Sequence, residues 1–216
     1  KIFYGEFDGR RDKRVLLIDT ERGSAERYAP LPGRNADPDN PKEPTFEFDY
    51  IALESHEPDT YVAALKEAVD PDVYSVVIVD SLSHAWAGKG GALEQVDRAA
   101  GRSETKNTYF AWRDVTPMHN RLVDALLSIQ AHLIVTMRSK MVYEIVENDK
   151  GKKEPKRIGL APVQRDGVEY EFDIVADMHN DGDINRLVVS KTRASFLKGE
   201  VINNPTSELG TRISEW

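Results

Sequence analysis

The residue best placed to do chemistry in this sequence is Asp80, which follows the four apolar β-branched side chains of Val76–Val79. A strand this apolar has no polar face, so both of its faces must be covered, as in a parallel sheet between helices. The carboxylate then lies at the C-terminal tip of the strand, where ligands bind in open α/β sheets. There it could hold Mg²⁺ beside a bound nucleotide, and the alternative is that Asp80 only caps the next turn.

A second apolar strand, predicted over Arg14–Glu21, ends in the carboxylates Asp19 and Glu21. If it neighbours the strand of Asp80, the two tips lie about 5 Å apart, or about 10 Å apart with one strand between them. Carboxylates this close repel each other unless a cation or a proton lies between them, and hydrated Mg²⁺ with a nucleotide meets that need. Glu21 would then orient or deprotonate the attacking water. The alternative is a solvated Glu21–Arg22 pair on a turn.

Two cations, Lys191 and Arg193, occupy alternate positions of a third polar-tipped segment, VVSKTR. Side chains alternate along a strand, so both cations point to the same side and favour an anion there. The phosphate chain of a nucleotide bound by a neighbouring subunit would serve. The alternative is an exposed basic edge strand that discourages edge-to-edge pairing.

The densest basic run in the chain comprises Lys150, Lys152, Lys153, Lys156 and Arg157. Tyr143 lies close by in the sequence as a stacking partner. A basic hairpin with an aromatic side chain suits single-stranded nucleic acid, because backbone charge and base stacking supply the affinity. A charge run on a hairpin can also be merely solvated, and that alternative stays open.

The elements that must position these residues follow from hydrophobic periodicity. Strands are expected at 14–21, 46–53, 74–80 and 131–138, and helices at 1–7, 59–69, within 88–101 and at 117–130. Residues 29–47 and 102–110 are expected to form a long surface loop and a mobile polar segment. Alternation of helices with fully apolar strands predicts an α/β fold whose mainly parallel sheet is covered by helices on both faces.

The character of the chain changes after Arg138. Residues 140–159 predict a hairpin, and a second hairpin around 179–183 is expected to extend the sheet on its antiparallel side. A short helix is predicted for 207–216. With no internal repeat, the simplest division is a single domain over residues 1–216.

Composition excludes several classes of protein. The chain of 216 residues has a net charge of −8, so the whole chain is not a polycation that coats nucleic acid. It contains no cysteine, which excludes disulfides and thiolate metal sites and suits a reducing cytoplasm. The five histidines lack the spacing of a zinc site, and the chain has no apolar run long enough to predict a membrane span.

Five blocks of the chain resemble, in order, a family of phage and prophage RecA-like P-loop ATPases. They are RVLLIDTERGSAERY, YSVVIVDSLSHAWAGKGG, AWRDVTPMHNRLVDALL, HLIVTMRSK and APVQRDGVEYEFDIVADM. The family is described as AAA-domain ATP-binding proteins and includes the RecA-core single-strand annealing proteins. The resemblance extends from Lys13 to Trp216 and implies a RecA-like P-loop NTPase core that uses ATP and Mg²⁺.

The resemblance also implies roles for residues at the strand tips. Asp80 matches the Walker B aspartate that holds Mg²⁺, directly or through water, with Ser81 beside it. Glu21 matches the glutamate that activates water in RecA-type ATPases. Thr136 and Arg138 fall where such proteins place a sensor of the γ-phosphate.

Outside the strand tips, Lys191 and Arg193 match the Lys-x-Arg pair that reaches into a neighbour's nucleotide site, which implies a homo-oligomer, ring or filament. Residues 139–160 lie where RecA-like proteins carry a mobile DNA-binding loop. The chain departs from the family in one respect, because it contains no phosphate loop of the type GxxxxGK[ST]. Gly88–Gly91 is no substitute, and we expect about 20–30 residues, a strand, the loop and a helix start, to precede Lys1.

The sequence thus predicts an ATP-binding and ATP-hydrolysing protein of the cytoplasm that acts on single-stranded DNA in phage recombination or replication. One rival is a RecA-like module that binds DNA or protein without turnover, which the missing phosphate loop favours. The other rival is a Mg²⁺-dependent nuclease with Asp19, Glu21 and Asp80 as metal ligands. Nuclease chemistry would need a further carboxylate or lysine at a strand end, and the sequence offers none.

Overall fold

The computed structural model describes residues 14–31, 33–40, 42, 44–67, 73–102, 107–147 and 153–216. Within residues 143–158, side-chain placement is described for Ile145 alone. The helix tail expected at 1–7 lies outside the described residues. Among the helices of the described part, none is both long and apolar enough to cross a membrane.

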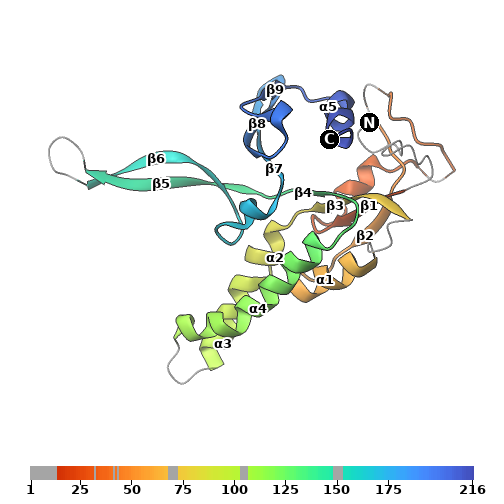
Figure 1. Cartoon of the computed structure of the whole chain (residues 1–216). Helices are drawn as coiled ribbons and strands as arrows, with labels where there is room; N and C mark the ends of the chain where they lie inside the picture. Colours follow the sequence, from red (N-terminus) through yellow and green to blue (C-terminus); the bar gives the residue numbers. More distant parts are fainter. Residues whose placement is uncertain are drawn as a thin grey trace.

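A four-stranded parallel sheet forms the centre of the molecule (Figure 1). Its strands, in spatial order, are β2 (Asp49–Ala52), β1 (Arg14–Asp19), β3 (Tyr74–Asp80) and β4 (His132–Val135). Each strand lies inside its predicted range, and the sheet is parallel throughout, as expected. The β-branched side chains of β3 are buried on both faces, which explains why its sequence has no polar alternation.

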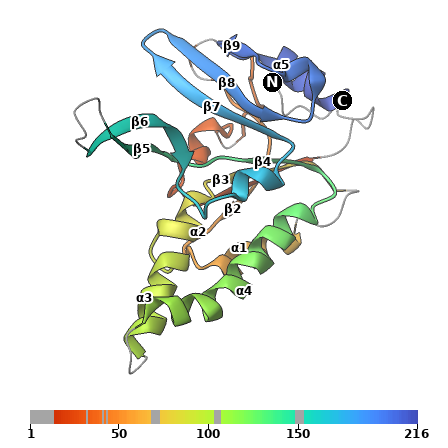
Figure 2. The ribbon, with the colours of Figure 1, turned by 60° about the vertical axis from the view of Figure 1, so that its left-hand side comes forward.

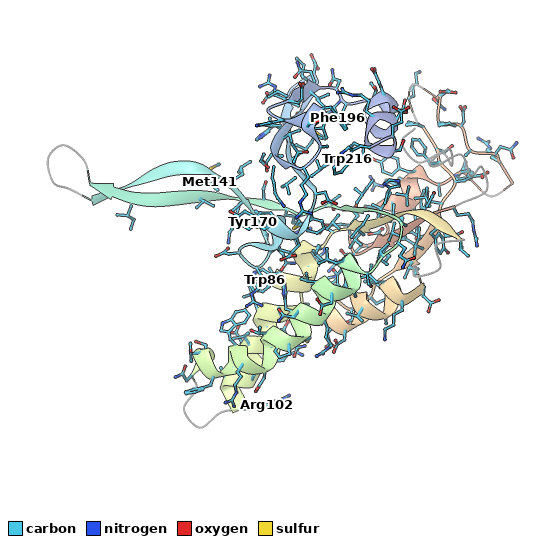
Figure 3. The ribbon with its side chains drawn as sticks, viewed as in Figure 1. Trp86, Arg102, Met141, Tyr170, Phe196 and Trp216 are labelled. Carbon is cyan, nitrogen blue, oxygen red and sulfur yellow. The ribbon has the colours of Figure 1, made fainter. Side chains whose placement is uncertain are left out.

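Helices α1 (Pro58–Glu67) and α4 (Thr108–Leu127) cover one face of this sheet. Their apolar stripes meet the strands in the main core, whose fully buried members include Ile18, Tyr61, Leu65, Val77, Val79 and Leu122. On the opposite face a smaller cluster of Val15, Val76 and Ile78 lies toward the C-terminal helix α5 (Ser207–Ser214). A cavity of about 510 Å³ on that side is bounded by Val76, Ile134, Ile213 and Trp216, and Figure 3 labels Trp216.

Helix α4 is longer than predicted, because it begins at Thr108 and runs through Pro117. Proline suits the first helical turn, so Pro117 was expected to mark the helix start. Instead Asn107 caps the helix, its side chain accepting a hydrogen bond from the backbone N–H of Tyr109. The helix includes the turns before Pro117 because Ala111 and Val115, in those turns, are buried against α3 (Ala92–Arg102). Of the segment expected to be mobile, residues 103–106 lie outside the description and 108–110 are helical.

A short helix, α2 (Ser83–Ala87), follows β3 directly and was not predicted. Its Trp86, labelled in Figure 3, lies beside α4, where its ring stacks on Trp112 with centroids 5.5 Å apart. Five residues are too few to show helical periodicity, so only the tertiary contacts reveal this helix.

The hairpin expected at 140–159 is present as β5 (Ser139–Glu147) and β6 (Lys153–Pro162). We call this hairpin the arm, because it projects away from the central sheet in both views (Figures 1 and 2). Its tip, residues 148–152, lies outside the described part of the chain.

The second predicted hairpin forms, but it does not extend the central sheet. Strands β7 (Ile174–Asp181), β8 (Ile184–Thr192) and β9 (Val201–Asn203) make a separate antiparallel sheet. This sheet has its own apolar cluster, in which Leu187 and Ile202 pack against Ala194, Leu197 and Leu209. The strands of this sheet bury their apolar side chains in that cluster, and none of them pairs with β4 at the edge of the central sheet.

Candidate functional site at the strand tips

Three strand ends converge at the C-terminal edge of the central sheet. Asp19 and Asp80 are register partners on adjacent strands, so the first of the two spacings considered from sequence applies. Backbone hydrogen bonds continue past them, from the Thr20 N–H to the Asp80 carbonyl at 2.7 Å and from the Thr136 N–H to the Val79 carbonyl at 3.0 Å. The side chains that follow the three strands are therefore held at one edge.

The Asp80 carboxylate receives a hydrogen bond from the Thr136 hydroxyl, with Oγ1 and Oδ1 2.6 Å apart. Asp80 is half-buried and Ser81, next in the chain, is buried. Carboxylate and hydroxyl oxygens are the hard donors that hydrated Mg²⁺ prefers. The oxygen donors present at this edge therefore fit Mg²⁺, with Asp80 and its hydroxyl neighbours as the residues that would hold the metal.

Glu21 and Arg138 form an ion pair across the top of β3. The Arg138 guanidinium donates to Oε1 at 2.9 Å and to Oε2 at 2.7 Å. The hydroxyl of Ser81 donates to Oε1 at 3.3 Å. Arg138 is held in place by its own backbone N–H, which donates to the Ser83 hydroxyl at 2.8 Å. The predicted set of Glu21, Asp80, Ser81, Thr136 and Arg138 is thus gathered at one place.

Thr20 and Ser81, which follow the ends of β1 and β3, are held by several buried hydrogen bonds. Thr20 and Ser81 are 1% and 2% exposed, and the Thr20 hydroxyl accepts from the Ser81 N–H at 2.9 Å. The Ser81 carbonyl accepts from the Tyr61 hydroxyl at 3.2 Å. Burial raises the pKa of Tyr61 to about 12, so that hydroxyl remains a donor at neutral pH. The peptide bond between Asp80 and Ser81 is cis.

A histidine that sequence reasoning missed also belongs to this site. His84 of α2 lies with Nδ1 2.9 Å from the Thr20 hydroxyl and Nε2 3.7 Å from Glu21 Oε1. Its ring stacks on His56, with centroids 4.6 Å apart. The spacing of the histidines was compared only with that of metal ligands. The signal in the sequence was that His84 follows Asp80 by four residues, just beyond the C-terminal tip of the strand.

Asp19 plays a structural part. Its buried carboxylate accepts hydrogen bonds from the Glu21 N–H at 2.5 Å, the Ala25 N–H at 3.3 Å and the Tyr50 hydroxyl at 3.0 Å. These donors shape the turn that carries Glu21. The described residues contain no group of three or more histidine, cysteine or acidic side chains able to hold a metal.

The structure places the two predicted trans-acting cations away from the strand tips. The Lys191 ammonium donates to the carbonyls of Glu169, Tyr170 and Phe172, at 3.2, 2.7 and 2.5 Å. Arg193 follows β8 and forms an ion pair with Asp173 at 2.6 Å. Their bonds therefore run to residues 169–173 within the same chain, and neither cation joins the cluster around Glu21.

The predicted nucleic-acid residues lie on the arm, where the structure describes part of them. The backbone register sets Tyr143 opposite Arg157, Glu144 opposite Lys156 and Glu147 opposite Lys153. Lys150 and Lys152 lie outside the described residues. The antiparallel pairing thus brings Tyr143 and the described basic residues, Lys153, Lys156 and Arg157, onto one hairpin.

The two ends of the arm, where β5 begins and β6 ends, are hydrogen-bonded to each other and to the loop after β3. Arg138 directly precedes β5, and its carbonyl accepts from the Val163 N–H at 2.7 Å. Gln164, which is 1% exposed, donates to the Leu82 carbonyl at 3.1 Å and lies 3.0 Å from the ring of His119.

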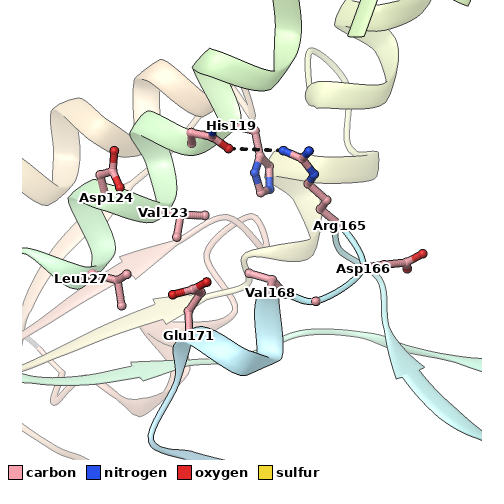
Figure 4. A pocket seen from close by; sticks show the side chains of 10 residues that line it. His119, Val123, Asp124, Leu127, Arg165, Asp166, Val168 and Glu171 are labelled. Atoms are coloured by element: carbon pink, nitrogen blue, oxygen red, sulfur yellow. Dashed lines mark hydrogen bonds between the residues drawn. The ribbon is translucent and has the colours of Figure 1, made fainter. Parts of the chain in front are cut away.

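Beside His119 is a cavity of about 410 Å³, lined by Arg165 and Asn120, which are joined by a hydrogen bond (Figure 4). Carboxylates of Asp124, Asp166 and Glu171 also line this cavity.

A parallel sheet covered by helices, with an acidic residue at the tip of a buried strand and a glutamate on the neighbouring one, defines the core of a P-loop-type nucleotide-binding protein. A comparison with family models matches residues 7–199 to the AAA domain family. The chain therefore belongs to that family, whose membership indicates a nucleotide-binding, ATPase-type function. A comparison with curated proteins gave no match.

Proposed function

We propose that the chain is the core of an oligomeric ATPase that acts on single-stranded DNA, in phage recombination or replication. The observation that carries the ATPase part is the convergence of Glu21, Asp80 and Arg138 at the edge of a parallel sheet. Arg138 donates to Glu21 at 2.9 and 2.7 Å, and Thr136, two residues before Arg138, donates to Asp80 at 2.6 Å. Asp80 would hold the magnesium-bound triphosphate, and Glu21 would orient the attacking water. Arg138 would meet negative charge on the γ-phosphate.

The glutamate role has a direct test in the natural gene product. The change Glu21→Gln keeps the shape of the side chain but removes the base, so hydrolysis should fall at least about a hundredfold while ATP binding changes little. Single-turnover hydrolysis and equilibrium binding of a fluorescent ATP analogue measure the two quantities separately. Glu200→Gln, an exposed change beyond the site, serves as the control. Hydrolysis by Glu21→Gln at the control's rate would refute the role.

The DNA part rests on the arm, whose register sets Lys153, Lys156 and Arg157 on the strand opposite the one that carries Tyr143. Neutralising Lys153 and Lys156 to glutamine should weaken binding of a labelled oligothymidylate. The slope of log affinity against log salt should also become shallower by about 0.7 for each phosphate that the variant no longer neutralises. Lys198→Gln, on the exposed surface of the C-terminal sheet region, is the matched control. An unchanged affinity and salt slope in the double variant would remove the arm from the DNA site.

A further inference from the structure

The strand-tip site contains an imidazole that faces the glutamate. Both ring nitrogens of His84 look toward the turn after β1: Nδ1 toward the Thr20 hydroxyl at 2.9 Å and Nε2 toward Glu21 Oε1 at 3.7 Å. The side chain is only 15% exposed. The ring therefore lies between the buried Thr20 hydroxyl and the Glu21 carboxylate.

Hydrogen-bond counting decides which nitrogen carries the proton. The Thr20 hydroxyl has one hydrogen, and it can point to the Ser81 carbonyl at 3.0 Å or to His84 Nδ1. The Ser81 carbonyl already has a donor in Tyr61. If Nδ1 carried the proton, the lone pair of Nε2 would face the Glu21 carboxylate, and two acceptors would oppose each other. The favoured arrangement is thus Thr20 donating to Nδ1 and Nε2–H pointing to Glu21.

The surroundings keep this ring neutral and in place. Burial lowers the pKa of His84, the neighbouring His56 and Arg138 lower it further, and Glu21 opposes them. His56 stacks on the ring at an interplanar angle of 16°. Gly88 permits this arrangement, because a Cβ there would meet the His84 carbonyl at 2.5 Å and His56 Nδ1 at 2.7 Å. The ring has little freedom to turn away from Glu21.

The two oxygens of Glu21 are therefore unlike. Oε1 accepts hydrogen bonds from Ser81 at 3.3 Å and from Arg138 at 2.9 Å, and His84 Nε2 lies 3.7 Å from it, just beyond hydrogen-bond distance. Within the described part of the chain, Oε2 is bonded by Arg138 alone. When a phosphate attracts Arg138, Oε1 keeps the Ser81 hydroxyl and His84 Nε2–H can close to hydrogen-bond distance, as catalytic hydrogen bonds often do only in the substrate complex. Oε2 then becomes the oxygen able to accept a proton from water.

We propose that His84 is a positioning residue, whose Nε2–H closes on Glu21 Oε1 when the nucleotide binds and so fixes Glu21 with Oε2 directed at the attacking water. This inference rests on the proposed ATPase function. It assigns His84 no contact with the nucleotide. A carboxylate misplaced by a fraction of an ångström loses much of its effect as a base, so loss of the Nε2 donor should lower the rate of hydrolysis about tenfold.

Three substitutions in the natural gene product separate the functions of the ring. His84→Gln places an amide N–H near the position of Nε2 and should lose less than about threefold in the rate of hydrolysis. His84→Asn reaches only Thr20, and His84→Phe keeps the stack on His56 without either nitrogen; both should lose about tenfold. Affinity for a fluorescent ATP analogue should stay within about twofold in all three. His179→Gln, on the separate C-terminal sheet, is the control.

The outcomes distinguish this inference from the proposed function. If the unaltered protein does not hydrolyse ATP, the function itself fails, and if Glu21→Gln hydrolyses ATP normally, the role of Glu21 fails and the role of His84 fails with it. If Glu21→Gln is inactive but His84→Asn and His84→Phe match the control, only the role of His84 is overturned. A His84→Gln variant as slow as His84→Phe would mean that the ring acts by packing, which also overturns it.

A spectroscopic measurement on the unaltered protein needs no variant to fold. Imidazole nitrogen chemical shifts in NMR identify the tautomer of His84. The Nε2–H tautomer is expected near neutral pH, and addition of a non-hydrolysable ATP analogue with Mg²⁺ should leave it unchanged. An Nδ1–H tautomer would overturn the inference.

Discussion

Arg138 grips the carboxylate of Glu21 with two hydrogen bonds, of 2.9 and 2.7 Å, although 117 positions separate the two residues in the chain. The pair spans the top of β3, because Glu21 follows β1 and Arg138 follows β4. It joins the proposed water-activating residue to the root of the arm, which begins at Ser139.

Replacing Arg138 should affect catalysis far more than stability. The ion pair is exposed on the arginine side, and such pairs contribute about 0–1 kcal/mol to the free energy of unfolding. Loss of a cation aimed at the γ-phosphate should slow hydrolysis at least about tenfold. Arg138→Gln is compared with Arg186→Gln, which breaks an exposed pair with Asp181 elsewhere. Urea unfolding and steady-state hydrolysis are measured on both variants, and equal rates would contradict the expectation.

Thr136 should act through Asp80. Thr136→Val removes the hydroxyl that donates to Asp80 Oδ1, so the carboxylate is no longer oriented by that hydrogen bond. A hydrogen bond to a charged group contributes roughly 1.5–3 kcal/mol, so the Mg²⁺ concentration for half-maximal hydrolysis should rise about tenfold. Thr136→Ser keeps the hydroxyl and should behave nearly as the natural protein. If serine and valine give the same shift, the hydroxyl is not the cause.

Subunit mixing tests whether Arg193 acts in a neighbour's site. In the structure it pairs with Asp173 of its own chain, so a role in trans requires that an assembly draw it away. Glu21→Gln and Arg193→Ala should each be inactive alone. If a site takes Glu21 from one subunit and Arg193 from the next, equal mixing should restore about a quarter of the natural activity. A mixture as inactive as its components would place both residues in a single-chain site or remove Arg193 from catalysis.

His119 should make the protein less stable in mild acid. It is 3% exposed, and burial lowers its pKa below the value of about 6.5 expected for the unfolded chain. The unfolded state therefore binds a proton more readily, so this part of the stability is present above about pH 6.5 and is lost as pH falls toward the lowered pKa. Urea unfolding at pH 7.5 and 5.5 should show a larger loss for the natural protein than for His119→Gln. Parallel losses would contradict the expectation, and the titration of His84 cancels in this comparison because both proteins contain it.

The sequence by itself determined the strands and the character of their tips. Runs of β-branched residues such as Val76–Val79 have one stable environment, a strand covered on both faces, so β1, β3 and β4 were predictable. Parallel strands with buried faces place their C-terminal residues at one edge, which predicted Asp80 and Glu21 at the same edge but left open whether their strands were adjacent. The two hairpins and the last helix followed from equally local signals.

Tertiary structure decided what depends on partners far away in the chain. Packing on α3 carries α4 through Pro117, and a separate apolar cluster draws β7–β9 away from the edge of the central sheet. The Glu21–Arg138 pair and the place of His84 beside Thr20 arise from strand order and from a five-residue helix, neither of which leaves a periodic pattern. Local sequence specifies which side chains can reach the edge of the sheet, whereas the long-range hydrogen bonds between strands specify which of them meet.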